Sequence, residues 1–370
     1  MKRIIFFTSS HKIGLTNQLT EHAICFTKMR QGKFLFLSGE NEQFPGLLAK
    51  LKKHDATYAI INGMDEHDDF FRLVKDFKDV VAKFRPDFVT VQTNWQLAIV
   101  AFARLIFGLR YSVVYVIHGY RHNYQLRSYI ARFTIGLALF LFADHVIAPS
   151  SFLKNKFNFL RDKVKVIFIG EDEKLFEDHP LPSFDGKLKF IFGGMFRTGK
   201  NQDLLIRALR KYIDKSGNNN VELYLPGDGP LLEQYRQLTR DLSIEDKVIF
   251  PGLVNRDDML PMYLQCQFAF APTNVETFGH CIAEPFVLGR VLFTRHTGVA
   301  DDVIKHGENG FFFDDENDLI DVLLKALPDK KLCENVAKNT RKARDLFRWE
   351  VICSKHFELI FEPLFSDTQT

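Results

Sequence analysis

The feature of this sequence that most constrains its fold is the regular alternation of short apolar runs with longer amphipathic stretches. The short runs are rich in Val, Ile and Phe, which favours β-strands. The stretches between them place apolar residues three and four positions apart, the spacing of an amphipathic helix, as in Phe70, Val74, Phe77 and Val81. Strands that alternate with helices build parallel sheets from βαβ units. The sequence therefore predicts an α/β protein.

The predicted strands fall into two series with a break between them. At 171–187 the chain is acidic, contains Pro180, Pro182 and Gly186 and loses its periodicity, so we place a linker there. A chain of 370 residues is also long enough for two domains. We predict two Rossmann-like, doubly wound domains, 1–172 and 173–345, and a terminal helix in 346–370 that packs back on the first. The strands are expected at 3–8, 33–37, 58–61, 87–92, 112–117, 145–148 and 163–169, and then at 189–192, 221–225, 247–250, 268–271, 291–294 and 310–313.

The composition is that of an ordinary soluble globular protein, with 46% hydrophobic and 26% charged residues. The five cysteines are scattered and lack the spacing of a zinc site, so we expect reduced thiols. The longest apolar stretch, 133–143, is about half of the roughly 20 residues that a membrane-spanning helix needs. The apolar run at the N-terminus ends at Phe7 and is interpreted as a strand rather than a signal peptide. We therefore expect a cytoplasmic protein.

Charge is distributed unevenly along the chain. Residues 1–170 hold 24 Lys and Arg against 13 Asp and Glu, whereas the remainder holds 25 against 33. The basic half also interleaves arginines with aromatic residues between Arg104 and Phe133, which suits the interface between water and acyl chains. We therefore expect the first domain to bind an anionic membrane surface peripherally, on the inner face of the cell membrane. The alternative is that 133–142 is the core of a crossover helix with solvated arginines at its rim.

The most specific motif lies where the predicted strand 268–271 leads into a helix that begins near Gly279. Free N–H groups at a helix start attract anions and hydroxyls, and Gly279 lets the backbone come close to a ligand. Two carboxylates eight residues apart, Glu276 and Glu284, flank this point and are suited to accept hydrogen bonds from sugar hydroxyls. From spacing alone, a solvated Glu276 and a helix-capping Glu284 fit equally well.

A second motif follows the first strand of the second domain, where Gly193 and Gly194 precede Arg197 and Lys200. A glycine-rich turn between strand and helix that carries two cations is suited to a diphosphate. The stretch is not a P-loop, because Asn201 stands where a Ser or Thr is required. A surface loop without a ligand is the alternative.

Two further positions follow predicted strands. The turn at 227–230, Gly-Asp-Gly-Pro, leads into a helix, and turn chemistry alone explains it at least as well as a ligand does. His118 lies at the carboxyl end of the strand 112–117, the edge at which open α/β sheets keep their ligands. A purely structural histidine is the alternative there.

Together these motifs resemble glycosyltransferase family four, a large group of retaining GT-B enzymes. The resemblance is specific over 145–315 and looser before it. The family's paired glutamates fall on Glu276 and Glu284, its phosphate-binding lysine on Lys200, and its Gly-Asp-Gly-Pro turn on 227–230. Its interdomain Asn-Gly-Val-Asp element falls on 169–172. The resemblance implies a GT-B fold, in which two Rossmann-like domains face each other across a cleft.

The resemblance also implies roles for the candidate residues. The donor diphosphate would lie between cations and the backbone amides near Gly279, and Glu284 would hold the ribose. Glu276 would contact hydroxyls of the donor sugar, and His118 the sugar near its anomeric centre. The implied donor-binding set is Arg197, Lys200, Phe278, Gly279, His280 and Glu284.

Three departures from the family pattern stand out. Met195 replaces the usual arginine five residues before the lysine, and Arg197 would supply that charge from a shifted position. The N-terminal Gly-Gly loop that frames donor and acceptor is reduced to a segment, 10–14, whose one glycine is Gly14. Thr277 replaces the commonest Gly after the first glutamate. We interpret these departures as altered substrate geometry rather than lost activity.

The expected activity is retaining, metal-independent transfer of a hexose or N-acetylhexosamine from a UDP- or GDP-sugar to a glycan. A lipid-linked glycan acceptor and a place in bacterial surface polysaccharide or lipopolysaccharide synthesis are expected, without cofactor, metal or nucleic acid. No Asp-x-Asp pair stands on a strand end where a metal would be needed. The alternatives are a nucleotide-sugar epimerase or phosphorylase of the same fold, and a degenerate glycosyltransferase that only binds.

Overall fold

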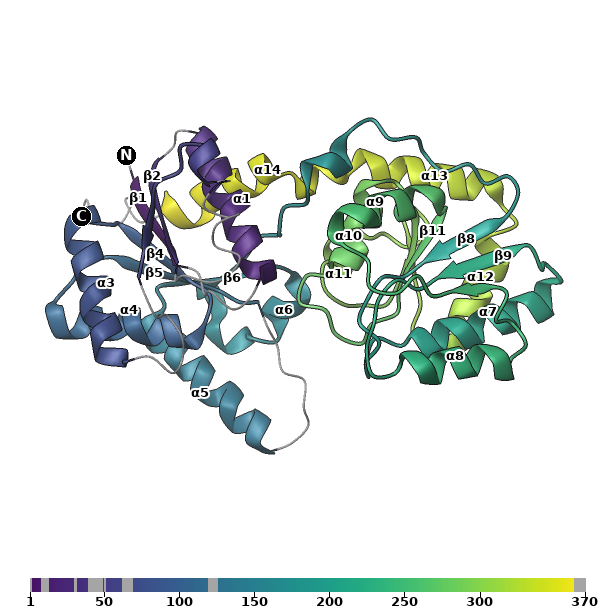
Figure 1. Cartoon of the computed structure of the whole chain (residues 1–370), viewed down its shortest axis with the longest axis horizontal. Coiled ribbons are helices and arrows are strands. Elements are labelled where there is room, and N and C mark those ends of the chain that lie inside the picture. The colour runs from purple at the N-terminus through teal and green to yellow at the C-terminus, as the bar shows by residue number, and fades with distance from the viewer. Residues whose placement is uncertain are drawn as a thin grey trace. The chain divides into compact units, whose positions relative to one another are not determined.

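The computed structural model describes residues 2–7, 13–29, 32–38, 49, 51–61, 69–118 and 126–362 (Figure 1). These residues form two compact units. The first unit combines the chain up to Gly170 with the C-terminal segment from Trp349, and the second unit runs from Glu171 to Arg348. The boundaries predicted after 172 and 345 therefore differ from the observed ones by two and three residues.

The first unit is built on a seven-stranded parallel sheet in the order β3-β2-β1-β4-β5-β6-β7. Its strands are β1 (Lys2–Phe7), β2 (Gly32–Ser38), β3 (Tyr58–Ile60), β4 (Phe88–Val91), β5 (Ser112–Val116), β6 (His145–Ala148) and β7 (Val164–Val166). Its helices are α1 (Ile13–Met29), α3 (Phe70–Phe84), α4 (Asn94–Phe107), α5 (Leu126–Phe142), α6 (Ser151–Asn155), the 3-10 helix η1 (Asn158–Lys163), α14 (Trp349–His356) and the π-helical turn η4 (Phe357–Phe361).

Helices cover both faces of this first sheet. One face packs against α3, α4 and α5 in a single apolar core that includes Phe77, Val100 and Leu139. On the other face α1 lies beside α14, the yellow helix next to the purple one in Figure 1. Phe26 of α1 stacks on Phe34 of β2. The sequence order and the right-handed crossover of βαβ units explain this division, because the chain reverses direction across the sheet after β3.

The second unit repeats the design with a six-stranded parallel sheet in the order β10-β9-β8-β11-β12-β13. Its strands are β8 (Leu188–Ile191), β9 (Val221–Tyr224), β10 (Val248–Ile249), β11 (Phe268–Ala271), β12 (Val291–Thr294) and β13 (Phe311–Phe312). Its helices are η2 (Glu173–Phe176), α7 (Gln202–Ser216), α8 (Leu232–Asp241), α9 (Arg256–Gln265), α10 (His280–Val287), α11 (Ala300–Val303), α12 (Glu316–Ala326), α13 (Lys330–Lys342) and η3 (Arg344–Phe347).

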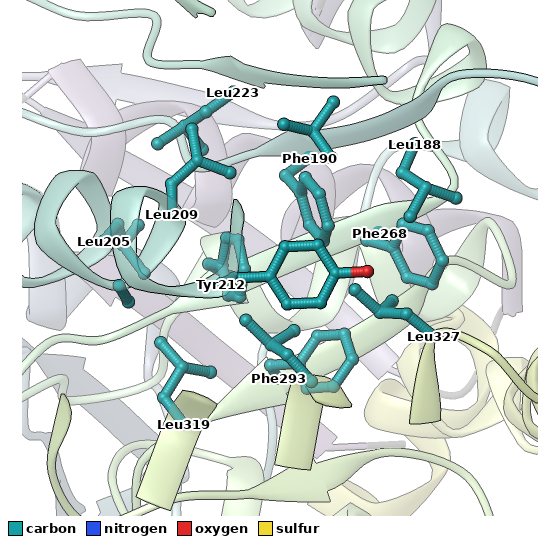
Figure 2. Close-up of a cluster of buried hydrophobic side chains, with 14 of the residues drawn as sticks. Leu188, Phe190, Leu205, Leu209, Tyr212, Leu223, Phe268, Phe293, Leu319 and Leu327 are labelled. Carbon is teal, nitrogen blue, oxygen red and sulfur yellow. The ribbon is translucent and has the colours of Figure 1, made fainter. Parts of the chain in front are cut away.

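Phenylalanines dominate the core of the second unit. Figure 2 shows Tyr212 of α7 reaching in among Phe190, Phe268 and Phe293 from three neighbouring strands. Phe190 and Phe268 stack with their ring centroids 5.0 Å apart. Burial of rings of this size contributes on the order of 2 kcal/mol each. This core fixes the carboxyl ends of β8, β11 and β12, where the candidate site lies.

Two sequence predictions about the chain's course need correction. The stretch 171–187 is not a free linker, because Leu175, Phe176 and Phe184 are buried and belong to the second unit. The expected single terminal helix from 346 is broken, because Phe347 ends η3 and a separate helix, α14, begins at Trp349. Phe347 packs on Phe286 of the second unit.

Candidate active site

The loops at the carboxyl edge of the second sheet are joined to one another by hydrogen bonds. Asn201, at the start of α7, donates through Nδ2 to the Pro272 carbonyl at 2.7 Å and to Asn274 Oδ1 at 2.8 Å, both after β11. Asn201 adopts a left-handed conformation with φ of 57°. The buried Gln202 donates to the carbonyls of Gly194, at 3.4 Å, and Met195, at 3.2 Å. The glycine-rich loop after β8 is therefore fixed to the loop that carries Glu276.

Lys200 and Glu276 meet directly at this edge. The Lys200 Nζ atom lies 2.5 Å from Glu276 Oε1, and each side chain retains 16% of its exposure. The pair comes from two loops that are 76 residues apart in the sequence. An ion pair that is mostly shielded from water is stronger than a surface pair, but the lysine still reaches solvent. A single cation and a single carboxylate thus share one position of the site.

Glycines allow the Glu276 loop to lie against the loop that follows β12. Gly298 has φ of +53°, and a Cβ atom there would stand 2.2 Å from the Phe278 carbonyl oxygen. The N–H of Val299 donates to that carbonyl at 2.8 Å, and Thr297 Oγ1 accepts from the N–H of Glu276 at 2.7 Å. Gly279, with φ of 95°, then turns the chain into α10. Glu276 and the start of α10 are consequently held in one rigid arrangement.

The Gly-Asp-Gly turn after β9 has a structural explanation. A Cβ atom on Gly227 would stand 2.1 Å from the Gly194 carbonyl oxygen, and one on Gly229 would stand 2.5 Å from the Phe196 carbonyl oxygen. The glycines are required because the turn packs against the backbone of the loop after β8. This packing explains the glycines without a ligand, and a ligand role for the turn stays a prediction.

Glu284 belongs to a cluster of charged groups one turn further along α10. Its Oε2 accepts a hydrogen bond from the Tyr263 hydroxyl at 3.0 Å, and its Oε1 lies 3.7 Å from Nε of Arg256. A second carboxylate, Glu171, is fully buried and accepts from Arg256 at 3.2 Å. Glu171 also lies 2.7 Å from Nδ1 of His280. Two carboxylates therefore share one arginine, and one of them also contacts a histidine.

This crowding shifts the protonation of the cluster. Burial and then the nearby Glu171 charge raise the pKa of Glu284 to about 7. Burial disfavours the charged form of His280, but the charge of Glu171 and its hydrogen bond outweigh it, so the pKa of His280 is raised. Each extra proton relieves repulsion between the carboxylates. The cluster changes its protonation near neutral pH.

The cluster opens on a small pocket between α9, η2 and α10. The ligand atoms of Glu171, His280 and Glu284 lie within 4.8 Å of one another, which is close enough for all three to bind one cation. Arg256 is within ion-pair distance of both carboxylates, so the protein itself supplies positive charge there. The pocket is lined by Asp172, Lys174, Leu175, Arg256, Met259, Leu260, Tyr263 and Glu284.

The structure places the other candidate residues as follows. Arg197 is exposed near Lys200, and Met195 is 58% exposed. Phe278 has only 2% of its surface exposed, so its side chain belongs to the core and its ring contacts Phe347. If Phe278 contacts the donor nucleotide sugar, it can do so only through its backbone.

Two candidates lie in the first unit. His118 follows β5 at the carboxyl end of the first sheet and is partly buried. Gly14 is not in a loop, because it lies in the first turn of α1. The preceding residues of that predicted loop, 10–12, lie outside the described part of the chain. The proposed contact of His118 with a sugar stays a prediction.

Three residues of the charged cluster were not found from the sequence: Glu171, Arg256 and Tyr263. Glu171 and His280 are 109 residues apart, and no local pattern connects them. One signal was available for Glu171, because it is a carboxylate where the family's interdomain element has a valine. A charge in place of an apolar residue indicates a partner elsewhere in the fold.

Two family models match this chain. The family model described as "Glycosyl transferases group 1" matches residues 171–343, which hold every described residue of the second unit's site. A second family model, "Glycosyltransferase Family 4", matches residues 45–173. The two models meet at the boundary between the compact units.

Individual relatives are distant. The chain is 24% identical over 225 residues to the N-acetyl-alpha-D-glucosaminyl L-malate synthase of Bacillus anthracis, which covers 60% of this chain and 57% of the relative. It is 23% identical over 316 residues to the alpha-monoglucosyldiacylglycerol synthase of Streptococcus pneumoniae, covering 76% and 70%. The chain spans about half of the length of several curated relatives that it matches.

A solved structure shows the same fold over nearly the whole chain. The crystal structure of Anabaena HepE in complex with UDP and glucose superposes with a TM-score of 0.75 at 20% identity. The match covers 97% of this chain and 99% of that one. Parallel sheets, site motifs and family models agree, and the chain belongs to glycosyltransferase family 4, with the GT-B fold.

Proposed function

We propose that the protein is a retaining, metal-independent glycosyltransferase that takes a hexose or N-acetylhexosamine from a UDP- or GDP-sugar. The observation that carries the proposal is the meeting of Lys200 with Glu276 beside the start of α10, one turn before Glu284. This edge offers a cation and helix N–H groups for a diphosphate, and carboxylates for hydroxyls. These are the groups that a nucleotide sugar presents.

In this proposal the departing nucleoside diphosphate is stabilised by positive charge from the protein. Lys200, the exposed Arg197 and the N–H groups that follow Gly279 supply this charge. The diphosphate competes with Glu276 for Lys200, so Glu276 is left to accept hydrogen bonds from the sugar. Glu284 accepts from the ribose in its ionised form, and His118 contacts the sugar near its anomeric centre.

The proposed acceptor is a glycan, either free or lipid-linked, in bacterial surface polysaccharide or lipopolysaccharide synthesis. The two relatives above are named as an N-acetyl-alpha-D-glucosaminyl L-malate synthase and an alpha-monoglucosyldiacylglycerol synthase, so the names of these relatives point to different products. No helix within the described residues is long and apolar enough to cross a membrane. We propose that the protein works at the inner face of the cell membrane as a peripheral protein.

The direct test is turnover of a panel of UDP-, GDP- and ADP-sugars, with the anomeric configuration of the released or transferred sugar read by proton NMR. We expect cleavage of one donor with retention. Inversion would contradict the retaining mechanism.

A second candidate is a degenerate glycosyltransferase that binds nucleotide sugars without turnover. Met195, in place of the family's arginine, is the observation that favours it. A thermal shift with one donor, combined with no cleavage and no transfer to any glycan, would identify this case, because a bound ligand stabilises the fold by mass action.

A further inference from the structure

The surface of the first unit over α3, α4 and α5 carries many exposed apolar side chains. Among the described residues, fourteen large hydrophobic side chains are exposed, and nine of them lie on or beside α3, α4 and α5. Isolated exposed residues of this kind are normal, but a contiguous group marks an interaction surface. We name this group the apolar surface; its members are Phe71, Phe102, Leu105, Ile106, Phe107, Leu137, Phe140, Leu141 and Phe159.

Helical spacing explains why these side chains point the same way. Phe102, Leu105 and Ile106 repeat at three and four positions on α4, opposite the buried residues that face the sheet. Leu137, Phe140 and Leu141 repeat in the same way on α5. Both helices pack on the same core, so their outer sides lie on one side of the sheet.

Contacts between elements make the surface continuous. Phe70, next to Phe71 on α3, touches Phe102 of α4 at 5.2 Å between centroids. Arg104 of α4 bonds to the Phe142 carbonyl at the end of α5, at 3.4 Å. Lys163, at the end of η1, donates to the Phe140 carbonyl at 2.6 Å. The surface therefore extends from α3 across α4 and α5 to η1.

Cations accompany the apolar side chains. Lys78 lies 5.4 Å from the centre of the Phe107 ring, and Lys163 lies 5.0 Å from that of Phe140. Residues 69–165, which contain the whole surface, hold fifteen Lys and Arg against six Asp and Glu. The segment is thus net positive, which disfavours pairing with a second copy, and Lys78 and Lys163 beside the apolar side chains attract phosphate-bearing headgroups.

We infer that the apolar surface docks on an anionic lipid bilayer, with its aromatic and aliphatic side chains at the level of the acyl chains and its cations among the headgroups. This surface overlaps the segment from Arg104 to Phe133 that the sequence suggested, but it is centred on the C-terminal halves of α4 and α5 and includes α3. The inference rests on the proposed peripheral attachment to a membrane, for which it names the docking surface and the lipid class, and it is independent of the donor chemistry, so failure of vesicle binding would leave the glycosyltransferase proposal standing.

The test is co-sedimentation of the full chain with vesicles of equal parts phosphatidylglycerol and phosphatidylcholine. We compare the wild type with a double variant, Leu105→Glu with Leu141→Glu. Both positions are exposed, so the fold should persist, and its melting temperature is measured in parallel. The matched control is Leu253→Glu, because Leu253 is the most exposed apolar side chain described, at 83%, and lies in the second unit. We expect the double variant to lose at least about tenfold in partition coefficient and the control to stay within twofold.

A second measurement does not depend on loss of binding. In a Leu105→Trp variant, tryptophan emission should shift to shorter wavelength with anionic vesicles at low salt, and much less with pure phosphatidylcholine or at high ionic strength. Equal binding of the double variant and the wild type, or no emission shift, would overturn the inference. So would a wild-type dimer, measured by light scattering, that the double variant converts to monomer, since the surface would then join two copies.

Discussion

Two regions of the second unit's sheet edge carry glutamates on either side of the same helix start, and they are arranged differently. Glu276 is paired with one cation, Lys200, at 2.5 Å. Glu284 lies beside a second carboxylate, Glu171; the two share Arg256, and Glu171 also contacts His280. In the first region one positive and one negative side chain neutralise each other by direct contact. In the second region the negative charge is reduced by proton uptake, because the pKa values of Glu284 and His280 are raised. In the proposed function the Lys200–Glu276 region binds the diphosphate and the Glu284 region binds the ribose, so we expect diphosphate binding to depend on a lysine and nucleoside binding to depend on pH.

The largest effect is expected from removing the cation at the balanced end. Lys200→Ala should weaken nucleoside diphosphate binding by at least about 100-fold, because a charge-assisted contact to phosphate is lost. Glu276 also loses its partner, so the free energy of unfolding should fall by about 1–3 kcal/mol. Titration calorimetry and urea denaturation measure the two effects.

The control for this variant is Lys331→Ala, which removes an exposed lysine of the same unit. The double variant Lys200→Ala with Glu276→Gln should recover most of the lost stability but none of the binding. Undiminished donor affinity in Lys200→Ala would show that the diphosphate binds elsewhere.

Glu276→Gln should act on turnover rather than on nucleotide binding. The amide keeps an acceptor oxygen but loses the charge that sugar hydroxyls would meet, so we expect kcat to fall about 100-fold. Affinity for the free nucleoside diphosphate should stay equal or rise slightly, since Lys200 is released from its partner. Steady-state kinetics and calorimetry separate the two quantities. A collapse of nucleotide affinity would mean that the roles of Glu276 and Glu284 are exchanged.

At the other end, stability should depend on pH. The pKa of Glu284 is about 7 in the folded protein against an ordinary 4.5, so the folded state binds more protons between these values. The free energy of unfolding should therefore fall as pH rises from about 4.5 to about 7, by up to about 3 kcal/mol. The raised pKa of His280 acts in the same direction as pH rises through its folded value.

Glu171→Gln tests the second cause of this dependence, the charge of Glu171, which acts in addition to burial. It removes the neighbouring negative charge, so the slope between pH 5 and about 7.5 should flatten, whereas Glu334→Gln, an exposed control, should keep the wild-type slope. In the wild type, nucleoside diphosphate affinity should rise with pH over the same window as Glu284 ionises, and Glu171→Gln should move that rise to lower pH. An identical slope in both variants would remove Glu171 from the account.

The smallest effect is expected from chelation. In the proposed mechanism protein cations supply the positive charge, so activity in excess EDTA should equal that of the untreated enzyme within error. The assay is donor turnover before and after dialysis against chelator. Complete loss that magnesium or manganese restores would contradict a metal-independent mechanism.

Much of the fold was predictable from local patterns. The strands at 145–148, 268–271 and 291–294 have the predicted bounds, because each is a short buried run with polar or turn residues at its ends. The helix predicted from the spacing of Phe70, Val74, Phe77 and Val81 begins at Phe70. Asp69 caps it by accepting from the N–H groups of the two residues that follow Phe70. Hydrophobic periodicity and helix capping depend on residues close together in the sequence, so they can be predicted from it.

The features that the sequence did not predict depend on contacts between residues far apart in the chain. The stretch 171–187 looked like a linker because its apolar residues are few, yet Phe184 packs on Phe268, 5.5 Å away between centroids. The paired glutamates were predicted from their spacing. The buried partner Glu171 was not, because its contacts to Arg256 and His280 span 85 and 109 residues.

The central claim is that one nucleotide sugar binds along the second sheet's edge from Lys200 to Glu284. The most direct test is a calorimetric titration, with the nucleoside diphosphate that gives the largest thermal shift, of the wild type, Lys200→Ala, Glu284→Gln and the control Lys331→Ala. The account predicts that affinity falls at least about 100-fold in Lys200→Ala and at least about tenfold in Glu284→Gln, and is unchanged in the control. Wild-type affinity in both site variants would contradict it.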